Sequence, residues 1–219
     1  ASALCAKNDM RVYTLRDASR NQSLPDLPGA THWTYAPPAE SSQEVHSYLR
    51  ATDVGIRRGQ TVARLLLEKK HQGFEPDVIY VHPAWGDALY LKDIFPDAYV
   101  IGLFEYFYQT RGADVGFDPE FPVAEQETAI QRLRFRNLNT ALHVDMATAG
   151  ITPTRFQFAS YPKVWQDMTS IIHDGIDTRF VCPNPDAALE ISGDLTLTRN
   201  DEVISFINRN LEPSRGYHQ

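Results

Sequence analysis

The fold class is decided by the stretch Asp77-Val78-Ile79-Tyr80-Val81-His82-Pro83-Ala84-Trp85-Gly86. Its first half is a short apolar run rich in β-branched residues, and prolines at positions 76 and 83 bound it. Because proline cannot continue a hydrogen-bonded ladder, the run predicts a strand over residues 77–82, and its lack of alternation predicts burial on both faces. A helical pattern over residues 87–95 follows, which is typical of one strand–helix step in an open α/β sheet.

A histidine, a tryptophan and a glycine follow this strand directly: His82, Trp85 and Gly86. Ligands of open α/β sheets bind outside the carboxyl ends of the strands. We therefore predict that these three residues line a site. The alternative is that His82 is a hydrogen-bonded loop histidine and that Trp85 fills the core, and position in a fold does not by itself decide between the two.

The composition limits the class of protein. The 219 residues are 42% hydrophobic and 22% charged, an ordinary globular balance. A net charge of −7 argues against a nucleic-acid partner, and two cysteines cannot make a disulfide framework or a cysteine-rich metal site. No apolar run approaches the ~20 residues that span a bilayer, and no signal peptide is visible. These features favour a cytoplasmic protein without a transmembrane segment.

Strand and helix patterns alternate along most of the chain. Strands are expected over residues 10–15, 31–35, 77–82, 99–104, 148–151 and 169–173. Helices are expected over residues 45–70, 87–95 and 125–146, with a further one capped by Thr152. Gly55 and Gly59 are expected to kink or divide the first helix. The alternation predicts a Rossmann-like α/β fold, with one mainly parallel sheet and helices on both faces.

The second central strand also ends in residues that suit a site. Glu105 and Tyr106 follow it, and a glycine-rich loop over residues 109–122 carries Arg111. We predict that these residues line the same cleft as His82. The alternative is that Glu105 is solvated and the aromatic residues pack in the core. The arginines of residues 125–146 are interpreted as a solvated helix face.

The last part of the chain departs from the alternation. Residues 178–186 look like a proline-containing linker, residues 189–197 like an extended segment and residues 203–207 like a new strand. A polar loop with Arg209, Arg215 and Gly216 follows that strand. We expect this strand to pair with a part of the protein outside this sequence.

Two motifs together resemble family-four glycosyltransferases of the GT-B fold. Ser170-Ile171-Ile172-His173-Asp174-Gly175-Ile176-Asp177 is similar to the end of the family's N-terminal domain, and Val203 to Gly216 is similar to the opening of its second domain. Thr152-Pro153-Thr154-Arg155-Phe156-Gln157, with Tyr161-Pro162, resembles the segment before the last strand in a bacterial subgroup. The resemblance implies an acceptor-side domain over residues 1–177, whose first strand is missing, and the start of a truncated donor-binding domain over residues 178–219.

The resemblance also implies a reaction and its residues. The family transfers a sugar from a nucleotide-diphosphate donor, with retention, to a glycan or lipid-linked acceptor. His82 matches the family's histidine near the donor sugar and phosphates, although Pro83-Ala84-Trp85 departs from the commoner pattern. Arg209 and Arg215 match the pair that grips the diphosphate, where the second residue is usually lysine. The alternative is that both are solvated loop arginines.

The resemblance implies no metal and no cofactor besides the nucleotide-sugar substrate. It places the enzyme in the cytoplasm, with a peripheral contact at the inner membrane as an option, and makes the missing C-terminal domain its partner. Two other interpretations stay open: a stand-alone Rossmann-like binding or regulatory domain, and a sugar-nucleotide epimerase of GT-B architecture.

Overall fold

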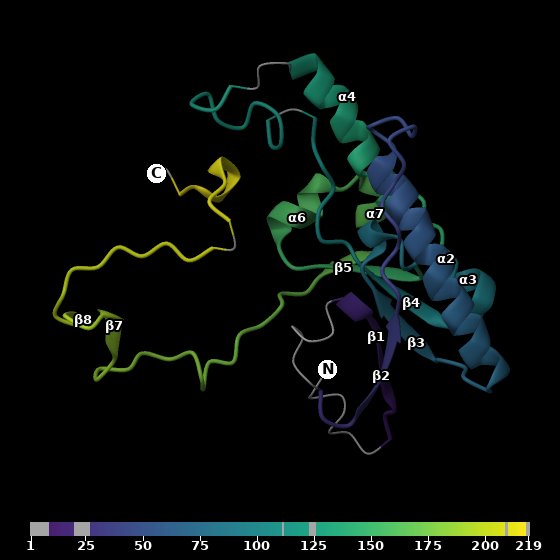
Figure 1. Ribbon diagram of the computed structural model, residues 1–219, viewed down its shortest axis with the longest axis horizontal. Coiled ribbons are helices and arrows are strands. Elements are labelled where there is room, and N and C mark those ends of the chain that lie inside the picture. Colours follow the sequence, from purple (N-terminus) through teal and green to yellow (C-terminus); the bar gives the residue numbers. More distant parts are fainter. Residues whose placement is uncertain (1–8, 20–26, 111, 123–125, 209, 218–219) are drawn as a thin grey trace.

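The computed structural model describes residues 9–19, 27–110, 112–122, 126–208 and 210–217. Helices flank parallel strands, as the sequence predicts for an α/β fold (Figure 1). The strands are β1 (Val12–Asp17), β2 (Ala30–Tyr35), β3 (Val78–Val81), β4 (Tyr99–Leu103), β5 (Ala149–Thr152), β6 (Thr169–Ile171), β7 (Ala188–Ser192) and β8 (Leu195–Thr198). The α-helices are α2 (Arg50–His71), α3 (Leu91–Ile94), α4 (Gln126–Arg136), α5 (Leu138–Ala141), α6 (Arg155–Ser160) and α7 (Lys163–Gln166), and the 3-10 helices are η2 (Pro83–Trp85) and η3 (Pro213–Arg215). The sequence of residues 1–7 also has the pattern of the last turns of a helix, but these residues lie outside the described residues.

The parallel strands form two hydrogen-bonded sheets. β3, β4, β5 and β6 pair in that order, with Val78 opposite Tyr99 and Gly102 opposite Gly150. Among the described residues, β1 pairs only with β2, also in parallel. The expectation of one sheet is therefore wrong for residues 10–15, because strand pairing is a tertiary property that the local pattern does not contain.

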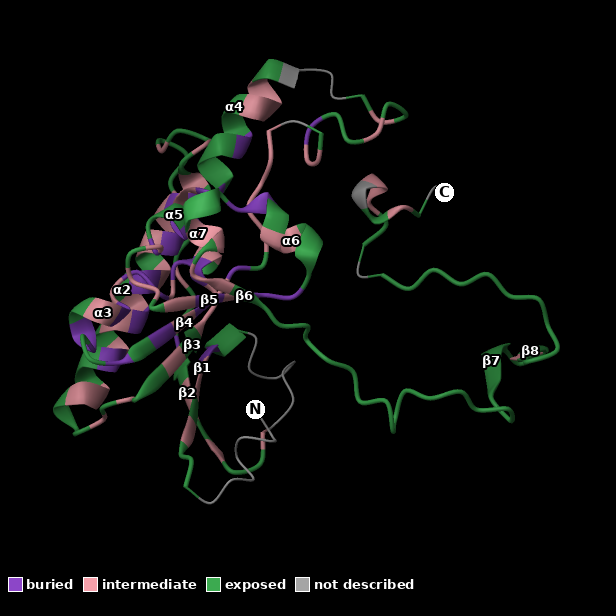
Figure 2. Ribbon diagram, turned by 180° about the vertical axis from the view of Figure 1, so that it is seen from behind, coloured by how far each residue is buried: buried purple, intermediate pink, exposed green. Residues whose placement is uncertain are grey.

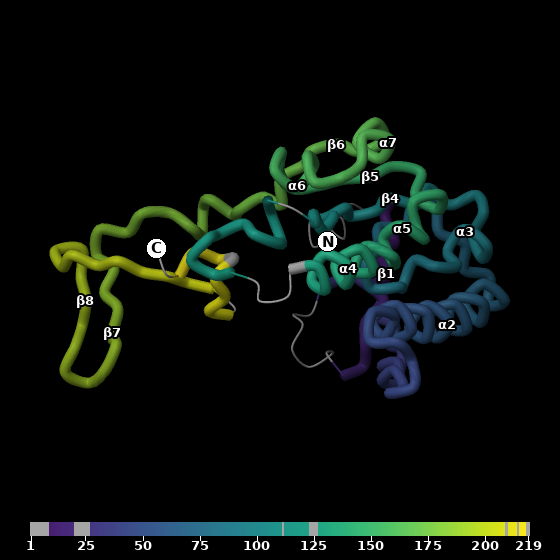
Figure 3. The backbone as a smooth tube through the Cα atoms, turned by 90° about the horizontal axis from the view of Figure 1, so that it is seen from above, coloured from purple at the N-terminus to yellow at the C-terminus, as the bar shows by residue number. Residues whose placement is uncertain are grey.

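The core lies between α2, α3 and the strands. Val62 and Leu66 of α2 pack with Ile94 and Phe95 at the end of α3, and with Tyr35 at the end of β2. At the β5–β6 side of the four-stranded sheet, other helices pack on the strands: α6 contacts β5 and β6, and α7 contacts β6 (Figure 3). Apolar burial on α2 follows the helical period, and lysines and a histidine in its last turn suit the helix dipole.

Three helices begin or end at other residues than the sequence predicts. α2 begins at Arg50 and runs unbroken through Gly55 and Gly59, which are buried contact points instead of kinks. The helix expected over residues 87–95 shrinks to α3 after the turn η2. The helix expected over residues 125–146 breaks at Asn137, whose side chain bonds both backbone groups of Tyr108, at 2.8 and 2.9 Å.

The expected cap of the following helix is also wrong by two residues. Thr152 is the buried last residue of β5, and Thr154 caps α6 by accepting a hydrogen bond from the backbone N–H of Gln157 at 3.2 Å. Thr154 has the extended backbone that an N-cap requires.

β3 is buried on one face only, contrary to expectation. It is an edge strand of the four-stranded sheet, and Val78 and Tyr80 are exposed beside Tyr99 of β4. The opposite face carries Ile79 and Val81 into the core. An apolar run without alternation therefore does not guarantee two covered faces.

Residues 172–208 are exposed except for a half-buried Leu197 (Figure 2). Residues 189–197 form most of a two-stranded antiparallel hairpin, β7 and β8. Residues 203–207 form no ladder with any described segment, and their apolar side chains face solvent. That they pair with a part of the protein outside this sequence stays a prediction. The domain division at residue 177 stays a prediction. No described helix combines the length and apolar character needed to cross a bilayer.

Candidate functional site

Polar side chains gather where the parallel strands end. Asp17 and Tyr35 are the last residues of β1 and β2. His82 is the first residue after β3, and Glu105 is the second residue after β4. Since β3 and β4 run in parallel and in register, their carboxyl ends lie at one edge.

His82 and Glu105 are in direct contact. Nε2 of His82 lies 2.8 Å from Oε2 of Glu105, within hydrogen-bonding distance. The histidine side chain is 14% exposed, whereas the glutamate is 59% exposed. Nδ1 of His82 is buried and has no hydrogen-bond partner among the described residues. The pair thus combines an oriented imidazole with a carboxylate open to solvent.

Trp85 lies flat against the same imidazole. The ring centroids of His82 and Trp85 are 4.4 Å apart, with 16° between the planes. Trp85 belongs to η2 and is 53% exposed, so it does not fill the core. The sequence-predicted neighbours His82, Trp85 and Glu105 are therefore together in space.

Gly86 is buried beneath this group and packs on α2. Its φ is +97°, and a Cβ there would lie 2.1 Å from the carbonyl oxygen of Gly55. Asn139 of α5 adds a hydrogen bond from Nδ2 to the carbonyl of Ala84 at 3.1 Å. Gly86 thus fixes the turn that carries His82 and Trp85, instead of lining an opening.

Tyr106 is fixed within its own loop. Its hydroxyl donates to Oδ2 of Asp114 at 3.0 Å, and that oxygen also accepts the backbone N–H of Gln109 at 2.7 Å. Burial, together with the negative charge of Asp114, raises the pKa of Tyr106 to about 12. Tyr106 is therefore a neutral donor that shapes the chain after Glu105.

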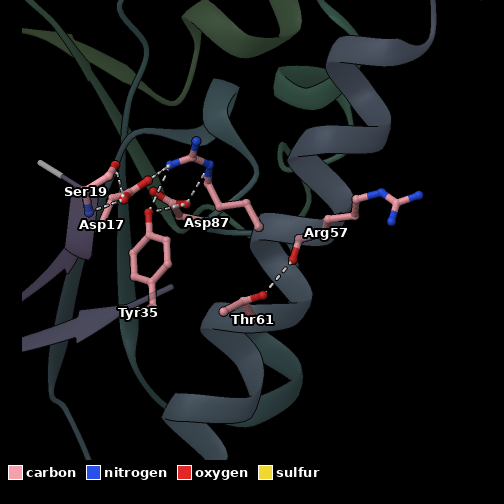
Figure 4. Close-up of polar contacts among 7 residues, drawn as sticks. Asp17, Ser19, Tyr35, Arg57, Thr61 and Asp87 are labelled. Carbon is pink, nitrogen blue, oxygen red and sulfur yellow. Dashed lines mark hydrogen bonds and ion pairs between the residues drawn. The ribbon is translucent and has the colours of Figure 1, made fainter. Parts of the chain in front are cut away.

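Sequence reasoning missed a charged network beside these residues. Arg58 of α2 donates to the hydroxyl of Tyr35 at 3.0 Å and lies 3.6 Å from Asp17 and 3.7 Å from Asp87. Figure 4 shows Asp17, Tyr35 and Asp87 converging on this point. Burial raises the pKa of Asp87, and the Arg58 guanidinium opposes that rise. The signal in the sequence is an arginine on the core-facing stripe of α2, between Gly55 and Val62.

Of the three predicted arginines, the structure describes Arg215 alone. Arg111 and Arg209 lie outside the described residues. Arg215 donates to Oδ1 of Asn208 at 2.8 Å and pairs with Glu212 at 3.6 Å, both in its own loop. Their role toward a diphosphate stays a prediction.

The arginines of α4 are exposed, as the solvated-face interpretation predicts. Two of them also cover aromatic rings: Arg132 lies 5.8 Å from the ring of Tyr48, and Arg136 lies 4.2 Å from that of Tyr108. In the part of the chain that is described, histidine, cysteine and carboxylate side chains form no cluster suited to a metal ion.

A buried histidine makes the stability of this region depend on pH. His143 is 2% exposed, and its Nδ1 donates to the carbonyl oxygen of Asn139. Burial lowers its pKa, so the unfolded chain binds a proton more readily than the folded one. We expect its contribution to stability to be complete above about pH 6.5 and to fall as the pH drops below that value.

Urea unfolding between pH 5.5 and 7.5 checks this expectation. The variant His143→Gln should show a shallower loss of unfolding free energy toward pH 5.5 than the unmodified protein. His173→Gln is the matched control, because His173 is exposed. Equal slopes for the unmodified protein and His143→Gln would contradict the assignment.

Comparison with known proteins identifies a family for most of the chain. The model of the glycosyl transferase family 4 group matches residues 8–181, which is most of the chain. A search among curated proteins found no significant match.

Proposed function

Because the chain belongs to glycosyltransferase family 4, we propose that it is the acceptor-side domain of a retaining enzyme. The enzyme moves a sugar from a nucleotide-diphosphate donor to a glycan or lipid-linked acceptor. The donor is its only cofactor-like ligand, no metal takes part, and a second, donor-binding domain completes the site. We expect it in the cytoplasm, with a peripheral contact at the inner membrane when the acceptor is lipid-linked.

The observation that carries this proposal is the His82–Glu105 pair at the carboxyl ends of β3 and β4. In sugar transfer, the acceptor oxygen bonds to the anomeric carbon while the bond from that carbon to a phosphate oxygen breaks. The proton of the acceptor hydroxyl passes to the departing phosphate oxygen, and negative charge grows on the diphosphate as the bond to the anomeric carbon breaks. Nδ1 of His82 is buried, so we propose that Nε2 passes its hydrogen bond from Glu105 to a phosphate oxygen as this charge grows.

Arg209 and Arg215 are proposed to hold the diphosphate from the opposite side. Arginine suits phosphate because its planar guanidinium makes paired hydrogen bonds. Arg215 already lies in a loop closed by Gly216, whose φ is +74°. Trp85, Glu105, Tyr106 and Arg111 are proposed to face the acceptor.

Transfer by the full-length enzyme is the test of this function. A panel of nucleotide sugars is offered with membrane lipid extract, and sugar incorporation and nucleotide release are measured. Transfer with retained anomeric configuration supports the proposal. Conversion of the donor into its epimer would favour the epimerase, and ligand binding without turnover would favour a stand-alone binding domain.

The 219 residues alone are expected to bind nucleotide diphosphates only at millimolar concentration or more weakly. Two hydrogen bonds to charged groups contribute about 1.5–3 kcal/mol each. Millimolar affinity already corresponds to ~4 kcal/mol, and ordering the loop opposes binding. Calorimetric titration at low and high salt checks this, because paired charges at a surface are screened.

The double variant Arg209→Ala/Arg215→Ala should remove the salt-sensitive part of that binding. Arg199→Ala is the matched control, since Arg199 is an exposed arginine of the hairpin region. Micromolar binding or sugar transfer by the 219 residues alone would overturn the two-domain proposal.

A further inference from the structure

Trp85 presents one free aromatic face. Its other face is covered by the imidazole of His82, at 4.4 Å between centroids, and yet 53% of the residue is exposed. An indole ring is large and apolar, so exposing it forgoes the free energy of burial. Trp85 is exposed at the strand ends, where ligands of open α/β sheets bind.

The ring is also rigidly placed. Gly86, directly after it, is in the left-handed region and touches the backbone of Gly55 in α2. The carbonyl of Ala84, directly before it, accepts a hydrogen bond from Asn139. Two neighbouring helices thus fix both ends of the turn, so the ordering cost of binding to this ring is small.

An exposed carboxylate is bonded to the imidazole that covers one face of the ring. Glu105 shares the imidazole with Trp85 and leaves its carboxylate open to solvent. A flat apolar surface beside a hydrogen-bond acceptor matches a pyranose, which has a C–H face and a rim of hydroxyl donors. Inorganic phosphate has no C–H face to stack on the indole, and a lipid chain would gain nothing from that carboxylate.

We propose that Trp85 is a stacking platform for a hexopyranose ring of the acceptor, with Glu105 accepting hydrogen bonds from its hydroxyl groups. That the sugar belongs to the acceptor rests on the proposed function, whereas that the ligand is a hexopyranose rests on the geometry alone. Trp85 is then a specificity-determining residue that selects a sugar over a simple alcohol or a phosphate.

Titration of the 219-residue chain by NMR tests the platform. The indole N–H signals of the three tryptophans are followed with methyl hexopyranosides, with sorbitol as an open-chain polyol and with inorganic phosphate. The signal that disappears in Trp85→Phe identifies Trp85. We expect that signal to shift with a pyranoside and to stay unmoved by sorbitol and phosphate.

Variants separate the platform from its surroundings. Trp85→Ala should weaken pyranoside binding about tenfold or more, while Trp85→Phe keeps most of it. Phe156→Ala is the matched control, because Phe156 is an exposed aromatic residue that the structure stacks on Tyr106 instead of His82. Glu105→Gln should weaken binding less than Trp85→Ala.

Failure of the stacking platform can be told apart from failure of the proposed function. No pyranoside-dependent shift of Trp85, or the same shift with sorbitol, overturns the platform even when the full-length enzyme transfers sugar. Absence of transfer by the full-length enzyme with every nucleotide sugar refutes the proposed function, and the pyranoside titration still decides the platform.

Discussion

Replacing His82 by alanine is expected to lower the turnover of the full-length enzyme by about 10²–10³-fold, the usual effect of removing one donor to a developing negative charge. The imidazole is held by Glu105 at 2.8 Å and backed by Trp85, so its orientation is set before substrate binds. The variant loses a group aimed at the transition state while the rest of the site stays in place. Steady-state kinetics with a saturating donor measure the effect.

The fold should tolerate this change. Glu105 is 59% exposed and becomes solvated when its partner is removed. The lost ring stacking is worth about 0.5–1.5 kcal/mol. At about 2–4 °C per kcal/mol for a chain of this size, the melting temperature should fall by only a few degrees.

His173→Ala is the control for this prediction, since His173 is an exposed histidine that accepts the backbone N–H of Gly175 at 3.0 Å. We expect it to keep most of the turnover. Glu105→Gln should fall between the two variants, because it keeps an acceptor for the imidazole but loses the charge. A His82→Ala enzyme with normal turnover would remove His82 from the catalytic group.

The central strands could be predicted because their signal is local. Residues 78–81 and 99–103 are short apolar runs between breakers, and such runs pair wherever they meet. The separate pairing of β1 with β2 could not be predicted, because it depends on which edges meet. The same limit explains residues 203–207, where a strand-like pattern has no described strand to pair with.

The candidate site also has one part that the sequence could predict and one part that it could not. His82 and Glu105 could be placed together because each follows a strand closely, and parallel register brings strand ends to one edge. The network of Arg58, Asp17 and Asp87 could not, because its members come from a helix, a strand and a loop. The sequence around each of these three residues does not predict contact with the other two. The one sequence signal is that Arg58 lies on the core-facing stripe of α2.

Gly86 should be the position least tolerant of a side chain. In Gly86→Ala the new Cβ would lie 2.1 Å from the carbonyl oxygen of Gly55 and 2.6 Å from its Cα. Both are backbone atoms of a long helix and cannot rotate away as a side chain does. The φ of +97° adds strain, because residues with a Cβ rarely adopt it.

Overpacking of this kind costs about 1–3 kcal/mol, and a strained backbone about 1–3 kcal/mol more. We expect Gly86→Ala to lose about 3 kcal/mol or more of unfolding free energy, and its melting temperature to fall by about 6–12 °C. Calorimetry and urea unfolding measure both quantities. Pyranoside binding at Trp85 should weaken in parallel, since the ring sits on the displaced turn.

Alanine variants of two other glycines separate the effect of the steric overlap from that of the positive φ. Gly175 has a φ of +81°, but a Cβ added there would meet no atom within 4 Å, so Gly175→Ala should show the backbone strain alone, about 1 kcal/mol. Gly193 has neither a positive φ nor a neighbour within that distance, so Gly193→Ala should be close to neutral. If Gly86→Ala loses no more stability than Gly175→Ala, the turn of His82 and Trp85 can move away from α2, and the rigid placement of the site residues is wrong.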